Sequence, residues 1–235
     1  MKIKKTVISN VMSLLFVGSA IASGNNSVYI DQTAADNSII SVTQTGSGNN
    51  LGDRNNLITP AFVIDGNNMN LTINQDGMNN SIIGNFIGGD SAATINQVGS
   101  GNSLTLTQGN FGTNGGLLFV DKTGDNNTVA LTMASTANTG NYNYSLTIVG
   151  DSNSVTSTMN SRYIANTISL TGNGNTVTTV QNGANGTANS PGHQIQLSVV
   201  GNANTFSITQ NGTTIPNIVT LNVAGNNTST TIIQH

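Results

Sequence analysis

Cysteine and glutamate are absent from this sequence of 235 residues, and the only histidines are His193 and His235. Without cysteine the chain cannot use disulfides, the usual reinforcement of small secreted proteins. A zinc site needs clustered ligands, and an active site needs a nucleophile or base with orienting partners. The sequence offers neither, and His193 lies in a Pro-Gly segment where we expect an ordinary loop residue. We therefore expect no enzyme activity, no metal and no cofactor.

Positive charge is scarce, and half of it lies at the N-terminus, at Lys2, Lys4 and Lys5. A short apolar run from Val11 to Val17 follows, and then Ala20-Ile21-Ala22, the small-x-small pattern that signal peptidase cleaves after. The apolar run is too short to span a bilayer. We expect residues 1–22 to be a Sec signal peptide and residues 23–235 to be a secreted protein that does not insert into a membrane.

The expected mature chain keeps three cations, Arg54, Lys122 and Arg162, against nine Asp, which gives a formal charge of −6. So few cations cannot neutralise phosphates, which argues against nucleic acid and anionic membrane surfaces as partners. Charged residues make up 6% of the sequence and aromatic residues 4%. Such a composition is typical either of disorder or of an ordered repeat held by backbone hydrogen bonds. The periodicity decides between the two.

Glycines that follow a predicted strand recur along the whole mature chain, at intervals of 22 to 31 residues. They are Gly46, Gly77, Gly99, Gly124, Gly150, Gly172, Gly201 and Gly225. Periods of about 20 to 50 residues are typical of solenoids and other repeat arrays.

The clearest unit reads Ser91-x5-Gln97-x-Gly99-x2-Asn102-x5-Gln108. Apolar and polar residues alternate on both sides of Gly99, which predicts two half-buried strands joined by a tight arc. Counting by twos places Gln97, Asn102 and Gln108 on the apolar face. Amides repeated at the same position of each turn can bond to their copies above and below, as in cross-β stacks. The alternative is that these amides are exposed and the chain is simply polar.

The same positions recur in part in the other units. They are occupied by Ser38, Gln44, Gly46 and Asn49; Gln75, Gly77 and Asn80; Gly124 and Asn127; Gly150 and Asn153; Gly172, Asn175 and Gln181; Gly201, Asn204 and Gln210; and Gly225 and Gln234. Later units replace the first Gln by Lys122, Ile148, Leu170, Val199 and Val223, so the first amide row is predicted to be partial.

These patterns predict a single all-β domain after Ser23, a β-solenoid of about eight strand–arc–strand repeats with two facing parallel sheets. The strand nearest the N-terminal end is expected to be irregular around residues 51–56, where the alternation fails. Both ends of such a stack are open sheet edges, and open edges recruit further strands.

The repeat Ser-x5-Gln-x-Gly-x2-Asn-x5-Gln resembles the curlin repeat of curli, the amyloid fibres of Gram-negative bacteria, over roughly Ser38 to Gln234. The resemblance implies a secreted subunit that polymerises with itself into extracellular fibres for adhesion and biofilm matrix. It also implies a nucleating subunit and a dedicated outer-membrane export pore as partners. The looser spacing and the missing amides leave three roles open: a fibre subunit, a nucleator, or a solenoid that stays monomeric.

A different function is that of a monomeric, surface-displayed solenoid that binds ice or a glycan surface through outward Thr-x-Thr pairs. Thr105/Thr107 and Thr176/Thr178 are such pairs, but from the sequence they do not occupy the same place on every turn, which argues against a flat array. Gly124-Asp125-Asn126 suggests calcium, but the register of calcium-binding β-rolls is absent, and an Asx-turn is the simpler interpretation.

Overall fold

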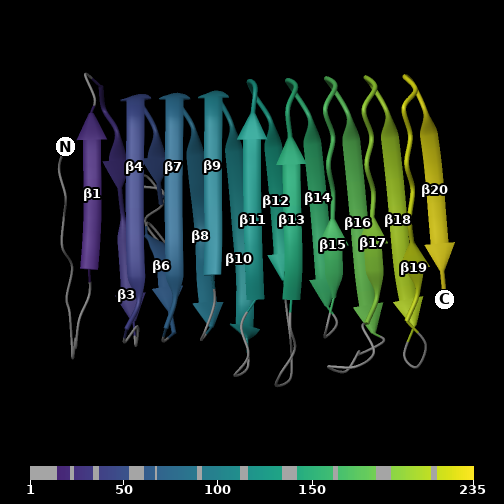
Figure 1. Ribbon diagram of the computed structural model, residues 1–235, viewed down its shortest axis with the longest axis horizontal. Coiled ribbons are helices and arrows are strands. Elements are labelled where there is room, and N and C mark those ends of the chain that lie inside the picture. Colours follow the sequence, from purple (N-terminus) through teal and green to yellow (C-terminus); the bar gives the residue numbers. More distant parts are fainter. Residues whose placement is uncertain are drawn as a thin grey trace.

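The computed structural model is an all-β solenoid in which two parallel sheets face each other along the stack, one in front of the other in Figure 1. It describes residues 15–21, 24–33, 37–52, 61–66, 68–88, 92–111, 116–133, 142–160, 164–183, 192–212 and 216–235. Within these ranges no helix is long and apolar enough to cross a membrane. The predicted fold class is confirmed.

The first sheet has nine strands, in the spatial order β1 (Leu15–Ile21), β4 (Ile39–Ser47), β7 (Asn70–Met78), β9 (Ala92–Ser100), β11 (Gly116–Thr123), β13 (Tyr142–Ile148), β15 (Ala165–Thr167), β17 (Gln194–Gln196) and β19 (Ile218–Val219). The main path of the second sheet is β2 (Ser27–Val28), β5 (Asn50–Leu51), β8 (Ser81–Gly88), β10 (Ser103–Phe111), β12 (Thr128–Met133), β14 (Ser154–Asn160), β16 (Thr176–Gly183), β18 (Thr205–Gly212) and β20 (Ser229–Gln234). Two further strands, β3 (Ile30–Thr33) and β6 (Phe62–Asp65), extend the levels of β2 and β5. We call one level of the stack, with its strand from each sheet, a rung.

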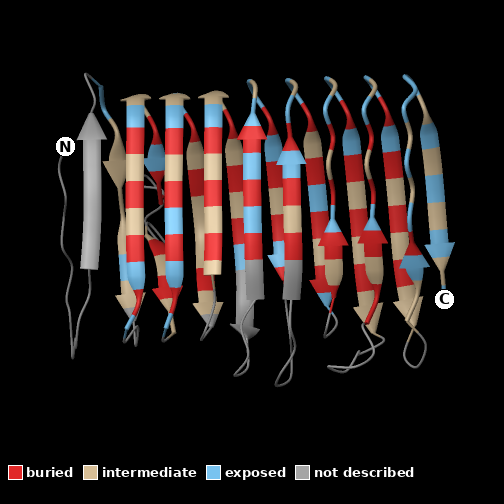
Figure 2. Ribbon diagram, in the orientation of Figure 1, coloured by how far each residue is buried: buried red, intermediate tan, exposed pale blue. Residues whose placement is uncertain are grey.

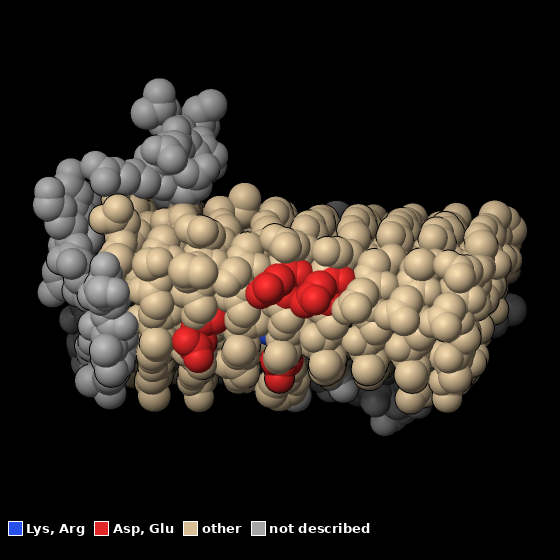
Figure 3. All heavy atoms as spheres, turned by 90° about the horizontal axis from the view of Figure 1, so that it is seen from above, with Lys and Arg blue, Asp and Glu red and all other residues tan. Residues whose placement is uncertain are grey.

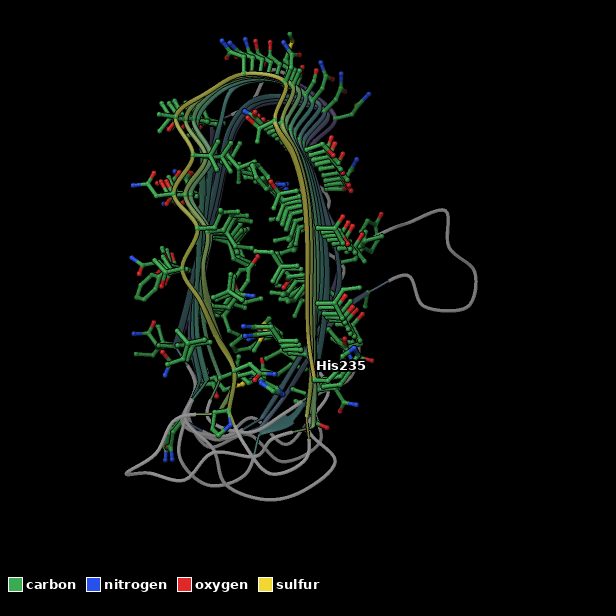
Figure 4. The ribbon with its side chains drawn as sticks, turned by 90° about the vertical axis from the view of Figure 1, so that its right-hand side faces the viewer. His235 is labelled. Carbon is green, nitrogen blue, oxygen red and sulfur yellow. The ribbon has the colours of Figure 1, made fainter. Side chains whose placement is uncertain are left out.

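Neighbouring rungs are stacked in register, so that equivalent repeat residues lie above one another. In β7 and β9, Ile73 pairs with Ile95, Gln75 with Gln97, and Gly77 with Gly99. Alternate residues of the strands inside the stack, such as β7 and β9, are buried, as the banding in Figure 2 shows. Seen along the stack, the side chains of successive rungs form columns, with one set between the two sheets and another pointing into solvent (Figure 4). The interior is therefore a continuous aliphatic core, with Leu71, Ile95 and Leu104 among its fully buried members.

The irregular strand predicted around residues 51–56 is explained by an insertion in the second sheet. Strand β5 ends at Leu51, and β6 resumes the same rung at Phe62, whose neighbour Val63 pairs with Asn85 of β8. Residues 53–60 lie outside the described ranges. After the insertion, β6 continues the rung. The register sets Phe62 opposite Gly84, so the fully buried ring of Phe62 can fill the space that Gly84, without a side chain, leaves in the core.

The N-terminal end holds a half repeat that the sequence analysis missed. Asn26 and Gln32 have the same separation as Asn102 and Gln108. Asn26 Oδ1 accepts the backbone N–H of Asn49 at 2.9 Å, and Gln32 pairs with Ile64. The first-sheet strand of this rung is β1, which pairs with β4 over seven residues and lies within the segment expected to be the signal peptide.

Candidate assembly interface

One asparagine per rung forms a buried row beside the arcs. Its members are Asn49, Asn80, Asn102, Asn127, Asn153, Asn175 and Asn204, all fully buried or nearly so. Each side-chain oxygen accepts the backbone N–H of the next asparagine, as Asn102 does from Asn127 at 3.0 Å. The row ends at Thr228, whose backbone N–H donates to Asn204 Oδ1 at 2.8 Å. Each side chain therefore sets the position of the next rung along the axis of the stack.

The side-chain nitrogen of the same asparagine holds the arcs together. Asn102 Nδ2 donates to the carbonyl oxygen of Val98 in its own arc, at 3.3 Å, and to that of Gly124 in the next, at 2.8 Å. The stacked arcs approach closely: a Cβ added to Gly77, whose φ is +120°, would lie 2.0 Å from the carbonyl oxygen of Gly99. This close approach is why the arc position requires glycine.

Glutamines form two shorter rows deeper between the sheets. Gln44 Nε2 donates to Gln75 Oε1 at 2.8 Å, and Gln75 Nε2 to Gln97 Oε1 at 3.0 Å. In the second sheet Gln181 donates to Gln210, and Gln210 to Gln234, both at 3.0 Å. In each of these bonds between two glutamines the donor lies on the N-terminal side and the acceptor on the C-terminal side. Ser91 and the side chain of Gln108 lie outside the described parts of the chain.

Lys122 takes the glutamine position on the rung after Gln97 and ends the first row. Its ammonium group is fully buried and donates to the Ser103 carbonyl oxygen at 2.7 Å. Gln97 makes the same kind of contact with Ser81, one rung earlier. Burial lowers the pKa of Lys122 from 10.5 to about 7, because the low-dielectric interior disfavours the charged form. The next rung places Ile148 in this column, so the amide row gives way to aliphatic packing.

His193, for which the sequence predicted an ordinary loop residue, has a fully buried side chain that bonds to two other segments. The Asn217 backbone N–H donates to its Nδ1 at 3.1 Å, and its Nε2 lies 2.9 Å from the Asn182 carbonyl oxygen. Ser38 has the equivalent role earlier in the stack, where Ser38 Oγ accepts the Met69 N–H at 3.1 Å. Both residues stand eight positions before an arc glycine, and this spacing could have identified His193 from the sequence as a repeat residue.

A polar patch interrupts the core in the middle of the stack. Ser157 and Thr179 hydroxyls bond to each other at 2.6 Å, and Asn166 Nδ2 donates to Ser157 Oγ at 3.0 Å. Asn166 Oδ1 and the hydroxyl of Tyr144 are buried without a partner. Burial raises the pKa of Tyr144.

The acidic residues of the arcs bond across rungs, which differs from the Asx-turn expected at Asp125. Asp125 Oδ1 accepts the Ser100 N–H at 2.6 Å, and Asp151 Oδ1 accepts the Asp125 N–H at 2.7 Å. Asparagines continue this outer row through Asn173, Asn202 and Asn226. Figure 3 looks onto the arcs and shows these exposed carboxylates on the surface. The described residues contain no group of three His, Cys, Asp or Glu side chains that could hold a metal ion.

The two ends of the stack carry the core residues that remain only partly buried. They are Val28 and Ile30 at the N-terminal end and Leu221, Val223 and Ile232 at the C-terminal end. Strands β19 and β20 are the last of their sheets, and no described strand covers their outer edges (Figure 1). The C-terminal end therefore presents unpaired backbone groups beside half-covered aliphatic side chains, a surface suited to receiving another strand.

A scan of this chain against protein-family models and a search of curated proteins found no match.

Proposed function

We propose that the protein is a secreted structural subunit that assembles end to end into extracellular cross-β fibres for adhesion and biofilm matrix. The observation that carries the proposal is the uncovered rung formed by β19 and β20. Its inward residues Leu221, Val223 and Ile232 are only partly buried, whereas equivalent residues within the stack are fully covered. A further rung would bury these side chains and pair the open edge.

The amide rows give the joint a direction. Gln234 Oε1 accepts from Gln210, and Gln234 Nε2 donates to the Ile218 carbonyl oxygen at 3.3 Å. Gln210 Nε2 donates both to a carbonyl and to the next glutamine, so the second N–H of Gln234 can continue the row into a new rung in the same way. A hydrogen bond from this N–H to an acceptor in the next subunit would offset the desolvation free energy of burying the amide. The C-terminal rung is also free of charged side chains, so no like-charge repulsion opposes stacking there.

The strand that best fits β20 is the β2–β3 segment of a second copy. Following the columns through the second sheet, Val28 stands in line with Thr230, Ile30 with Ile232, and Gln32 with Gln234. Adding β2–β3 to β20 would therefore set Ile30 on Ile232, place Val28 on the methyl-bearing side chain of Thr230, and extend the glutamine row with Gln32. The resemblance to curlin repeats supports the same assignment and suggests a nucleating subunit and an outer-membrane export pore as further partners.

Purified protein starting at Ser23 tests the proposal. At micromolar concentration we expect fibres in electron micrographs, thioflavin binding that is accelerated by preformed seeds, and a meridional diffraction repeat of about 4.7 Å. A sample that stays monomeric for days in the presence of seeds would show that the open rung does not drive assembly.

A further inference from the structure

The solvent-facing side of the second sheet carries a regular array of hydroxyl side chains from β10 to β20. The pairings align three outward columns across these six strands. The columns are Ser103, Thr128, Ser154, Thr176, Thr205 and Ser229; Thr105, Ala130, Thr156, Thr178, Ser207 and Thr231; and Thr107, Thr132, Thr158, Val180, Thr209 and Ile233. All are Thr or Ser except Ala130, Val180 and Ile233.

The register confirms that the Thr-x-Thr pairs shift from turn to turn, because Thr176/Thr178 lies one column away from Thr105/Thr107. The shift does not break the array, since Ser and Thr fill most positions of all three columns. Thr105 and Thr107 align with Thr156 and Thr158 two rungs later, while Thr178 falls in the Thr105 column. The links between rungs differ in length, which hides the alignment in the sequence. In the fold the two pairs overlap in one column, that of Thr105 and Thr178.

The array has a fixed two-dimensional spacing. Strands in a sheet lie about 4.8 Å apart, and alternate residues along a strand lie about 6.6 Å apart. Threonine is branched at Cβ and stiff at χ1, so each methyl and hydroxyl is held in a defined direction. Figure 4 shows the outward side chains of successive rungs nearly superposed, so the sheet keeps this lattice along the stack.

The array is also electrically neutral. No charged or aromatic residue stands in the three columns. The described exposed acids lie outside these six strands, for example on the arcs at Asp125 and Asp151, on the first sheet at Asp121, and at the N-terminal end of the second sheet at Asp31. A neutral face is matched to an uncharged ligand rather than to a charged mineral or a polyanion. Because none of the three columns holds an aromatic residue, this face lacks the usual stacking surface for sugars.

We propose that this hydroxyl face, defined by the three columns above, binds ice. Water molecules in ice form an uncharged, ordered lattice of donors and acceptors, which a rigid array of hydroxyl groups can match and which the intervening methyl groups can pack against. The columns run along the side of the stack, so binding does not compete with a rung added at β20. A fibre of such subunits would repeat this face once per copy, with the N-terminal rungs of Asp31, Val63 and Asn85 between successive faces.

Measurements of ice recrystallisation and thermal hysteresis on monomeric protein starting at Ser23 test this inference. We expect ice crystals to stay small, and the double variant Thr156→Lys/Thr178→Lys, which places two cations in adjacent rungs of the face, to lose at least ten-fold in activity. The matched control is Thr72→Lys/Thr94→Lys, an outward pair in adjacent rungs of the first sheet.

Three results would overturn the inference: no ice activity in the unsubstituted protein, equal losses in the two double variants, or an effect of the Thr156/Thr178 variant on lateral bundling of fibres alone. The last would identify the face as a contact between copies. Because the substitutions avoid the ends of the stack, both variants should still form fibres, so a failure of ice binding is distinct from a failure of assembly.

Discussion

Lys122 Nζ lies 2.7 Å from the carbonyl oxygen of Ser103, which belongs to the preceding rung. Gln75 Nε2 and Gln97 Nε2 occupy the same position in their own rungs, and they donate in the same way to the carbonyl oxygens of Asn50 and Ser81. The lysine thus reproduces the donor of the glutamine row but not its acceptor. It also brings a charge into a site that otherwise holds neutral amides, so the stability of the stack depends on whether this amine is protonated.

We predict that the free energy of unfolding rises between pH 7 and pH 10. The pKa of Lys122 is about 7 in the folded protein and 10.5 when exposed. Between these values the unfolded chain binds more protons than the folded chain, so stability increases with pH, and below pH 7 this contribution levels off. Urea unfolding of soluble monomer at several pH values measures it.

The Lys122→Gln variant should remove this pH dependence and raise the free energy of unfolding at pH 7 by about 1–3 kcal/mol, because it restores a neutral donor and adds an acceptor for Gln97. Lys122→Met is the control: it should also remove the pH dependence, but it leaves the Ser103 carbonyl oxygen without its donor. An unchanged pH profile in both variants would mean that Lys122 is not the group responsible.

Asn102→Ala should destabilise the protein far more than Thr105→Ala. The first change removes the acceptor of the Asn127 N–H and the donor to Gly124, all in a buried position, at a cost of about 2–4 kcal/mol. The second shortens a side chain on the outer face, with an expected cost within about 0.5 kcal/mol. Equal shifts in the urea midpoint would contradict the assignment of the asparagine row as the element that joins the rungs.

Sequence spacing identified the buried amides well because they fall on the same alternating face as the aliphatic residues in both strands. Gln97 and Asn102 are fully buried, as their parity with Ile95 and Leu104 predicts. The role of His193 was missed because residue type was given more weight than its place in the repeat. The sequence suggested an outward hydroxyl array but argued against it, because its columns join residues 22 to 29 apart and only the backbone pairing shows which residues align.

Alanine substitutions at two arc glycines distinguish the effect of a strained backbone from the effect of a steric clash between stacked arcs. Gly77→Ala places a Cβ 2.0 Å from the Gly99 carbonyl oxygen, at a φ of +120°, and should prevent the two arcs from stacking. Gly174→Ala is the matched control, since its φ is +65° and no atom lies within 4 Å of the added Cβ. We expect a loss of about 1 kcal/mol for Gly174→Ala and failure to form the native stack for Gly77→Ala, as followed by circular dichroism. Similar losses would show that the arcs do not require this close approach.

Tyr144→Phe should leave the protein equally stable or make it more stable by about 1 kcal/mol. The Tyr144 hydroxyl is buried without a hydrogen-bond partner, and removing such a group abolishes its desolvation cost while keeping the ring. Thermal unfolding of the two proteins gives the comparison. A clear loss of stability in the variant would mean that the hydroxyl has a partner in solution.

The central claim, that β20 receives the β2–β3 segment of the next copy, is tested most directly by cysteine cross-linking, because the chain has no native cysteine. Asp31 and Ile233 stand in one outward column of the second sheet, at opposite ends of the stack. Across the proposed joint their Cα atoms would lie about 4.8 Å apart, within disulfide range, whereas Asp31 and Thr231 would lie about 8 Å apart.

Fibres of the double variant Asp31→Cys/Ile233→Cys should therefore yield, after oxidation and dissolution, a ladder of disulfide-linked multimers on a non-reducing gel. Fibres of Asp31→Cys/Thr231→Cys should yield monomer. Equal cross-linking of the two variants, or none in the matched pair despite abundant fibres, would contradict the proposed joint.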